Sequence, residues 1–331
     1  MPRLGYKLMT EELGPRELVT CAVRAEEAGF EFAAISDHFF PWLDEQGHSP
    51  FAWSVLGAIA TATERIGLMT AVTCPTLRYH PAIVAQAAAT VSLLSNGRFR
   101  LGLGSGERLN EHVVGGGWPS VQIRQELLEE AVDIIRLLFE GRMASYEGQH
   151  IQLESARLFD LPDAPPEILL AAGGPQAARI AAEKADGLVA SETDPDLVSV
   201  YRDAGGDGPC YVEVSMCWSQ SEDEARETLH RYSRWSGLGW SVLAELPTPR
   251  AFDEASQSVR PEDVAEDTPH GPDTTRYVEA IGEAIDAGFD HVVLHQVGPK
   301  QSDFLRFFEQ ELMPAVRTQL RPFAEEERAT S

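Results

Sequence analysis

The stretch Phe32-Ala33-Ala34-Ile35-Ser36-Asp37-His38-Phe39-Phe40-Pro41-Trp42 decides the fold that we expect for this chain. Its first four residues are apolar, which is typical of a strand buried on both faces. The run then changes abruptly to a hydroxyl and two ionisable groups, followed by aromatic residues. Ligands of parallel α/β folds bind at the carboxyl ends of strands, so this change indicates a site. On this stretch alone a plainer interpretation stays open, in which Asp37 caps a helix and His38 packs without a function.

Strand-like apolar runs alternate with helical segments along the rest of the chain. We expect strands over 4–8, 32–35, 66–72, 99–104, 167–172, 186–190, 210–217 and 291–295, with helices between them. Regular alternation predicts a parallel sheet, and about eight strands in one chain favour a (β/α)8 TIM barrel. The runner-up is a Rossmann-type doubly wound sheet. Its glycine fingerprint is absent after the first strand, which reads Leu4-Gly5-Tyr6-Lys7-Leu8.

Two segments interrupt the alternation and predict insertions after strands 4 and 7. Residues 146–153 indicate an added extended segment. Residues 237–272 are rich in proline, glycine and acidic residues and indicate an insertion. A last helix is expected over 304–320, followed by a charged, frayed tail. We expect residues 1–331 to form a single domain.

The composition limits the class of protein. The net charge is −25, from 27 basic and 52 acidic residues, which argues against binding to nucleic acid or anionic lipid. No apolar run approaches the length of a membrane span, and the N-terminus lacks a signal-peptide pattern, so we expect a cytoplasmic location. No metal site is expected, because no cysteine has zinc-ligand spacing. The four cysteines are expected to be reduced structural thiols: Cys21, Cys74, Cys210 and Cys217.

In a barrel, the polar residues that end the strands meet at one rim. Each could be an ordinary turn or cap, but their convergence favours a site. His38 is the best candidate for proton transfer because its pKa is near neutral, and Glu107 is a candidate second acid–base group or a plain helix-start carboxylate. Gly173-Gly174-Pro175-Gln176 could cradle a phosphate with free backbone N–H groups, or form a turn. Gly102, Gly104 and Gly106 indicate a backbone approached closely by something flat.

Several motifs, in order along most of the chain, carry a family resemblance. They are Leu4-Gly5-Tyr6, Ser36-Asp37-His38-Phe39, Pro41-Trp42, Gly47-His48, Arg78-Tyr79, Gly104-Ser105-Gly106-Glu107, Leu109-Asn110-Glu111, Ala171-Ala172-Gly173-Gly174-Pro175 and Ala185-Asp186-Gly187. With these motifs the chain resembles the luciferase-like flavin and deazaflavin oxidoreductases. More narrowly, it is similar to the F420-dependent glucose-6-phosphate dehydrogenase group.

The resemblance implies a luciferase-like barrel that binds coenzyme F420 at its rim. His38 would be the base that takes the substrate's hydroxyl proton, Trp42 would position the reacting centre, and Glu107 would be the acid–base partner near the deazaflavin. A non-prolyl cis peptide is implied at Ala71-Val72, and a homodimer through helices near the first three strands, such as 81–95. The implied coenzyme-contacting residues are Asp37, Cys74, Ser105, Gly106, Asn110, Gly173, Gly174, Gln176 and Ala177.

Departures from the family concern the substrate. The sugar-phosphate enzymes hold the phosphate with two lysines and an arginine, but the first lysine position here is Asp194, and 237–272 contains no lysine. Ser191 matches a neighbouring substrate position. We therefore expect hydride transfer between F420 and a small alcohol, ketone or activated alkene rather than glucose 6-phosphate. The alternatives are an FMN-dependent monooxygenase, a sugar-phosphate dehydrogenase with a different phosphate site, and a non-catalytic barrel kept for binding or assembly.

Overall fold

Eight parallel strands close into a barrel in the computed structural model, which describes residues 2–320. The strands are β1 (Arg3–Leu8), β2 (Phe32–Ile35), β3 (Gly67–Thr70), β4 (Phe99–Leu103), β7 (Ile168–Ala171), β8 (Gly187–Ala190), β9 (Cys210–Met216) and β10 (His291–Gln296). Their order around the barrel is β1-β10-β9-β8-β7-β4-β3-β2. The predicted (β/α)8 barrel is confirmed, and the Rossmann-type alternative is wrong because this sheet closes on itself. The tail predicted after residue 320 lies outside the described residues.

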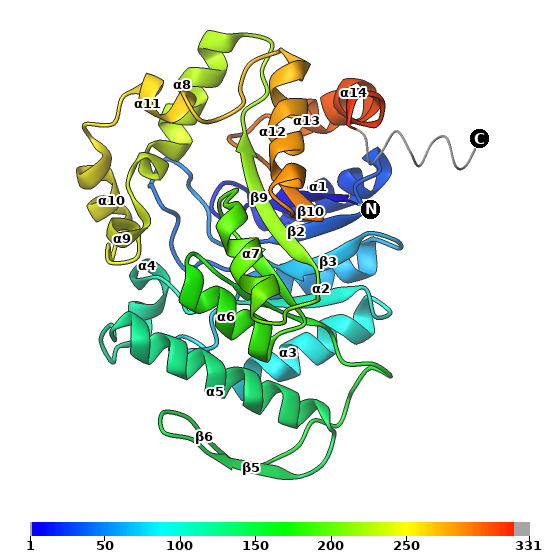
Figure 1. Ribbon diagram of the computed structural model, residues 1–331, viewed down its shortest axis with the longest axis vertical. Helices are drawn as coiled ribbons and strands as arrows, with labels where there is room; N and C mark the ends of the chain where they lie inside the picture. Colours follow the sequence, from blue (N-terminus) through cyan, green and yellow to red (C-terminus); the bar gives the residue numbers. More distant parts are fainter. Residues whose placement is uncertain (1, 321–331) are drawn as a thin grey trace.

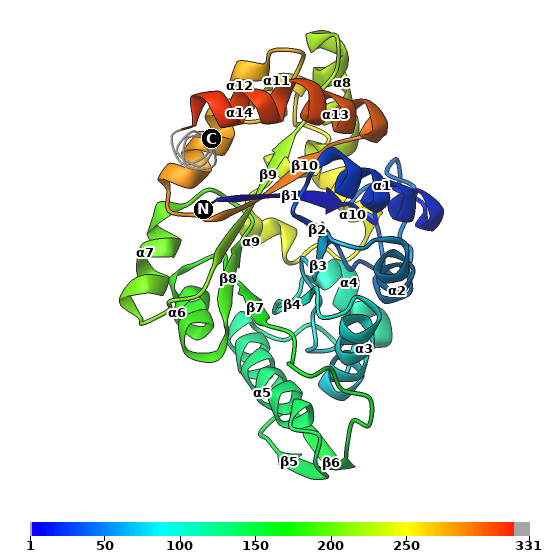
Figure 2. The same cartoon turned by 90° about the vertical axis from the view of Figure 1, so that its right-hand side faces the viewer.

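Helices surround the strands, as Figures 1 and 2 show. They include α1 (Pro15–Ala28), α2 (Ala52–Ala62), α3 (Pro81–Leu94), α5 (Val121–Phe139), α6 (Pro175–Lys184), α7 (Pro195–Asp203), α8 (Glu222–Ser233), α12 (Thr274–Asp286), α13 (Gln301–Phe307) and α14 (Met313–Gln319). Proline begins α1, α3, α6 and α7, where its missing N–H has no helical partner to lose. A π-helical segment, η3 (Phe308–Leu312), joins α13 to α14, so the expected last helix is continuous without being uniformly α.

The barrel interior changes from apolar to charged along the strands. An apolar layer contains Phe32, Ala34, Met69, Leu169, Tyr211 and Val293. Nearer the carboxyl ends, Glu213 on β9 pairs with Lys7 Nζ at 2.6 Å and His295 Nδ1 at 3.3 Å. The charged layer therefore lies beneath the rim and is largely buried, with 6% of the Lys7 and 4% of the His295 side chain exposed.

Gly102 in β4 and Gly104 just after it lie against the neighbouring backbone of the barrel wall. A Cβ on Gly102 would lie 2.0 Å from the Thr70 carbonyl oxygen, and one on Gly104 would lie 2.7 Å from the Val72 side chain. The neighbouring strand is thus what approaches this backbone closely. The expectation of a flat ligand against these two glycines is wrong, because the space is already filled.

Both predicted insertions are present. After β4 come α4 (Arg108–Glu111), a 3₁₀ turn η1 (His112–Val114) and α5, followed by an antiparallel hairpin of β5 (Ala144–Glu147) and β6 (Gln152–Ala156) rather than one extended segment. After β9 come α8, a 3₁₀ turn η2 (Arg234–Gly237) and the short helices α9 (Trp240–Leu243), α10 (Pro249–Ser256) and α11 (Pro261–Ala265). In Figure 1 the hairpin projects beyond α5, whereas α9 lies beside α4.

Within residues 2–320, no helix is long and apolar enough to cross a membrane. The four cysteines are buried and unpaired. Among the same residues no group of three or more His, Cys, Asp or Glu side chains is arranged to hold a metal ion. The cytoplasmic location stays a prediction.

Candidate active site

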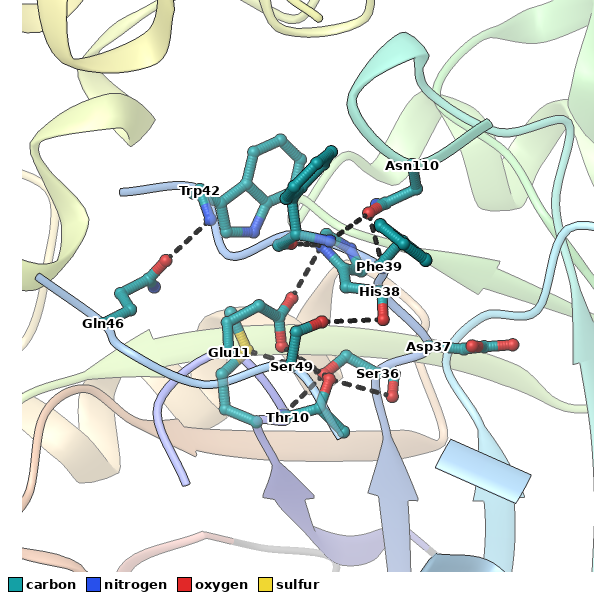
Figure 3. Close-up of polar contacts among 12 residues, drawn as sticks. Thr10, Glu11, Ser36, Asp37, His38, Phe39, Trp42, Gln46, Ser49 and Asn110 are labelled. Atoms are coloured by element: carbon teal, nitrogen blue, oxygen red, sulfur yellow. Dashed lines mark hydrogen bonds and ion pairs between the residues drawn. The ribbon is translucent and has the colours of Figure 1, made fainter. Parts of the chain in front are cut away.

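His38 lies at the rim because β2 ends three residues earlier, at Ile35. Its ring is nearly buried, with 12% of the side chain exposed. Nδ1 lies 3.0 Å from Glu11 Oε1, and Nε2 lies 3.5 Å from Glu107 Oε1. A carboxylate on each side of one imidazole is an arrangement that can take up and release a proton. Figure 3 shows Glu11 directed toward the ring.

Glu11 is the residue that the sequence reasoning missed. It sits in the turn after β1 and is fully buried, and its Oε2 accepts hydrogen bonds from Ser36 Oγ at 2.5 Å and Thr10 Oγ1 at 3.0 Å. Burial acts to raise the pKa of Glu11, but His38 and the Ser36 hydrogen bond outweigh it and lower that pKa to about 2. Burial acts to lower the pKa of His38, yet Glu11 and then Glu107 raise it above its ordinary value. Glu11 is therefore an ionised partner that stabilises the protonated imidazole.

Asn110 joins the two sides of the site. Its Oδ1 accepts the backbone N–H groups of Phe39 at 2.7 Å and Phe40 at 3.1 Å, and its Nδ2 donates to Glu107 Oε1. Asn110 therefore fixes the distance between the loop after β2 and the start of α4. The Glu107 carboxyl keeps its place opposite His38 through this amide.

Trp42 packs beside His38, with ring centroids 4.9 Å apart and planes inclined by 60°. Its backbone N–H donates to Gln46 Oε1 at 2.8 Å. The structure thus brings together His38, Glu107 and Trp42, the three predicted catalytic residues. Their predicted roles stay predictions.

Asp37 points away from His38 (Figure 3) and its carboxylate is engaged inside the protein. Thr73 Oγ1 donates to it at 2.7 Å, Tyr79 Oη at 3.0 Å and Arg78 at 3.1 Å. These contacts tie the ends of β2 and β3 together. The geometry gives its carboxylate an anchoring role, and contact with a coenzyme stays a prediction.

Glu111 is a second buried carboxyl that the sequence reasoning did not single out. Oε2 accepts the Arg78 backbone N–H at 2.9 Å, and Oε1 lies 3.5 Å from Arg78 Nε. Burial raises the pKa of Glu111 to about 7, although Arg78 opposes the rise. The side chain lies against Gly106, whose φ is +83° and where a Cβ would come within 2.8 Å of Glu111 Cγ. A glycine is therefore required there by both conformation and space.

The ends of β3 and β4 bring further predicted residues to the rim. Cys74 is buried, and Ser105 and Gly106 are half-buried beside it. Burial raises the pKa of the Cys74 thiol well above its usual range. The peptide bond Ala71-Val72 is cis, as the resemblance implied.

The start of α6 offers free backbone donors. Gly174 is its N-cap residue without a side-chain hydrogen bond, and Cβ atoms built on Gly173 or Gly174 meet nothing within 4 Å. Gln176 and Ala177 follow in the first turn. The backbone here is open, and a phosphate site at this turn stays a prediction. Ser191 is exposed just after β8, and within residues 2–320 no hydrogen bond or ion pair joins it to His38, Glu107 or Trp42.

Comparisons with known proteins agree with this geometry. The luciferase-like monooxygenase family matches residues 1–291. An F420-dependent glucose-6-phosphate dehydrogenase of Amycolatopsis mediterranei (strain U-32) is 35% identical, with 96% of this chain and 99% of that protein covered. One from Nocardia farcinica (strain IFM 10152) is 36% identical, with 95% and 98% covered.

Solved structures place the barrel among the same proteins. An F420-dependent secondary alcohol dehydrogenase in complex with an F420-acetone adduct superposes with a TM-score of 0.88, at 29% identity, over 95% of this chain and 99% of that one. A type II Baeyer-Villiger monooxygenase in complex with FMN shares the fold, with a TM-score of 0.70 at 18% identity over 96% and 99%. The chain belongs to the luciferase-like family, in its branch of F420-dependent oxidoreductases.

Proposed function

We propose that this protein binds coenzyme F420 at the barrel mouth and transfers a hydride between F420 and a small alcohol, ketone or activated alkene. The observation that carries the proposal is His38, held between Glu11 and Glu107 beside Trp42. The oxidation of a hydroxyl releases a proton, which a base such as His38 can accept and a second acid–base group such as Glu107 can pass on. The named relatives and the F420-acetone complex support the coenzyme.

The residues at the rim fit a phosphate-bearing coenzyme. The open cradle at the start of α6 leaves room for an anion close to free N–H groups. When bound, F420 supplies a hydride acceptor or donor at C5 of its deazaflavin ring. The residues proposed to hold it are Asp37, Cys74, Ser105, Gly106, Asn110, Gly173, Gly174, Gln176 and Ala177.

The proposed proton transfer follows from the tautomer of His38. Two acceptors lie beside Nδ1, the Phe40 carbonyl at 3.3 Å and Glu11 Oε1 at 3.0 Å, so Nδ1 keeps the proton of the neutral ring. Nε2 then carries a lone pair on the side of Glu107. There it accepts the substrate's hydroxyl proton as the hydride leaves the carbon. Glu11 then stabilises the imidazolium, and Glu107 provides an onward path for the proton. In the opposite direction the same groups deliver a proton to a carbonyl oxygen.

We propose that glucose 6-phosphate is not the substrate, because the expected phosphate positions hold no free cation. Asp194 caps α7, accepting the Asp196 N–H at 2.9 Å. The two arginines of 237–272 are paired on the surface, Arg250 with Glu254 at 2.8 Å and Arg260 with Asp263 at 2.5 Å. Ser191 remains the proposed substrate residue on this side, as a neutral hydrogen-bonding group.

Two alternatives have specific support. The curated relatives are named glucose-6-phosphate dehydrogenases, which favours a sugar phosphate held at a different site. The shared fold with an FMN complex keeps an FMN-dependent monooxygenase open. The intact group of His38, Trp42 and Glu107 argues against a non-catalytic barrel.

Side-by-side titration of the purified protein with F420 and FMN, followed by fluorescence quenching, tests the coenzyme. F420 binding with negligible FMN binding is expected, and the reverse preference would contradict the proposal. Reduction of F420 with 2-propanol, cyclohexanol and glucose 6-phosphate then tests the substrate.

His38→Ala is expected to lose at least about a hundredfold in kcat, since general base catalysis typically contributes that much. Unchanged turnover in this variant would refute the role of His38.

We further propose that the protein is a homodimer. An apolar groove of about 350 Å³ lies between α2 and α3. Phe51, Ile83 and Leu94 on its walls are 53%, 57% and 44% exposed. Exposed apolar patches of this kind mark protein interfaces, and in a two-fold dimer the same face of a second copy would cover this one.

A further inference from the structure

The Trp42 indole is packed between aromatic rings, and one of them comes from a distant part of the chain. Trp235 stacks on it, with centroids 4.3 Å apart and planes within 13°. The Phe252 edge contacts it at 5.1 Å and 75°, and His38 lies at 4.9 Å. Trp235 and Phe252 belong to η2 and α10, which follow β9.

Stacking is what orients the Trp42 ring. Its backbone N–H is bonded to Gln46, but no hydrogen bond joins the indole N–H to any of residues 2–320. Ring orientation therefore depends on the neighbouring faces. Offset or parallel stacking against a second indole restricts the tilt of a ring more than aliphatic packing does.

Trp235 is itself held at this place by a buried cation. Arg234, only 8% exposed, donates to Glu45 at 3.0 Å and to Asp253 at 2.6 Å. Glu45 follows Trp42 in the β2 loop, whereas Asp253 is on α10. One guanidinium thus joins the two segments that supply the stacked rings, and its charge-assisted bonds fix their spacing. The Trp235 indole N–H donates to Tyr232 O at 3.2 Å, which sets its own tilt.

We propose that Trp235 is a positioning residue of the active site: it holds Trp42 against His38 and gives this wall of the substrate site an uncharged, apolar character. The inference rests on the proposed function, adds a residue to it and narrows its substrate class. Compact secondary alcohols and ketones with hydrocarbon chains fit such a wall. Because Trp235 acts through Trp42, its loss is expected to lower kcat, with a smaller effect on KM.

The test compares Trp235→Ala, Trp235→Phe and the control Trp240→Ala. Trp240 is in the neighbouring helix α9, is 50% exposed and makes no ring contact within residues 2–320. With F420 and 2-propanol or cyclohexanol, Trp235→Ala is expected to lose about tenfold or more in kcat. Trp235→Phe is expected to stay within about threefold of the wild type, and Trp240→Ala within about twofold. The F420 dissociation constant is expected to change by less than about twofold in all three.

A readout independent of activity accompanies the kinetics. Two stacked indoles give a circular-dichroism couplet in the far ultraviolet, which Trp235→Ala and Trp235→Phe are expected to lose and Trp240→Ala to keep. Loss of the couplet with wild-type kcat in Trp235→Ala would overturn the inference alone. Failure of the wild type to bind F420 would overturn the proposed function and this inference with it. If the alanine variant does not fold, Trp235→Leu keeps more of the apolar volume without a ring and is expected to show the same loss of kcat.

Discussion

At the scale of residues, the site depends on one register. β1 and β2 pair in parallel with Leu8 opposite Ile35, and both Glu11 and His38 lie three residues beyond these partners. Two short turns of equal length therefore place a carboxylate against an imidazole. Because Glu11 and His38 are buried together, their charges interact strongly, and the pKa of each depends on the charge of the other.

Replacing Glu11 with glutamine is expected to shift the pH profile of kcat/KM. The base form of His38 is needed for alcohol oxidation, and removal of the Glu11 charge lowers the His38 pKa. The acid limb of the profile should then move to lower pH, and the plateau should fall because the imidazolium is less stable. Steady-state kinetics between about pH 5 and pH 9 measure this shift. The exposed Glu17→Gln is the control, and an unmoved acid limb in Glu11→Gln would contradict the pairing.

Replacing Glu111 with glutamine is expected to change the pH dependence of stability. The Glu111 pKa is raised by burial to about 7, so the folded state binds its proton more tightly than the unfolded chain. The free energy of unfolding should therefore decrease as the pH rises from about 4.5 to about 7, by roughly 3 kcal/mol from this group. Glu111→Gln should lack this decrease.

Urea unfolding of the wild type and Glu111→Gln at pH 5 and pH 8 measures the difference. The control is Glu227→Gln, at an exposed position on α8. If Glu111→Gln and the wild type lose equal stability between the two pH values, Glu111 does not carry a raised pKa.

At the scale of elements, the barrel strands position the site and the segments after β4 and β9 complete it. Arg108 N donates to the Ala244 carbonyl at 3.0 Å, so α4 and α9 are linked across the rim. A cluster of Trp42, Leu109, Leu243 and Phe252 lies beneath that link. The second insertion is therefore packed against the site, although its composition suggested only an interruption of the alternation.

A larger side chain at the start of α6 is expected to weaken coenzyme binding without harming the fold. Gly174 has extended dihedrals, φ −177° and ψ 169°, that any residue adopts, and a Cβ there meets nothing within 4 Å. In Gly174→Val the side chain would occupy the space of the proposed phosphate. The F420 dissociation constant should rise about tenfold or more, while Tm stays within about 2 °C.

Fluorescence titration and thermal unfolding of this variant are compared with those of Gly239→Val. Gly239 is likewise the N-cap of a helix, α9, with φ −67° and open space around its Cβ. Equal F420 affinity in both variants and the wild type would remove α6 from the coenzyme site.

At the scale of the whole molecule, the surface combines a large negative net charge with an exposed apolar groove. A net charge of −25 gives general repulsion between molecules, so a specific contact needs an apolar face that overcomes it. The groove between α2 and α3 is such a face. α3 also presents buried residues to the barrel, including Val84, Ala88 and Val91. The core-facing interpretation of this helix is confirmed on its buried side, and the dimer-forming interpretation stays a prediction for its exposed side.

Ile83→Glu is expected to convert the proposed dimer into a monomer. The side chain is 57% exposed, and a carboxylate at this point would be buried without a partner in a self-complementary contact. Light scattering coupled to size-exclusion chromatography gives the mass, for which the chain contributes 36.3 kDa. Val242→Glu, at a 43% exposed position on α9, should leave the mass unchanged. A wild-type mass of one chain would contradict the homodimer.

The sequence alone determined the barrel and the neighbourhood of its site. An apolar run indicates a buried strand, and the polar residues that follow it indicate where the strand ends. Both can be recognised from a few neighbouring residues in the sequence. His38 and Glu107 could be named for that reason, whereas the role of Trp42 was implied by the family resemblance. The structure brings all three to one place.

Only the tertiary structure decided the partners of these residues. Glu11 lies beside His38 through the register of β1 on β2, Glu111 acquires its raised pKa by burial under Gly106, and Trp235 reaches Trp42 from almost two hundred positions away. Such pairs leave no local pattern, since their contact arises from chain closure and side-chain packing rather than from spacing along the sequence. The charge of a group can be read from its type, whereas its pKa and its orientation follow from what surrounds it.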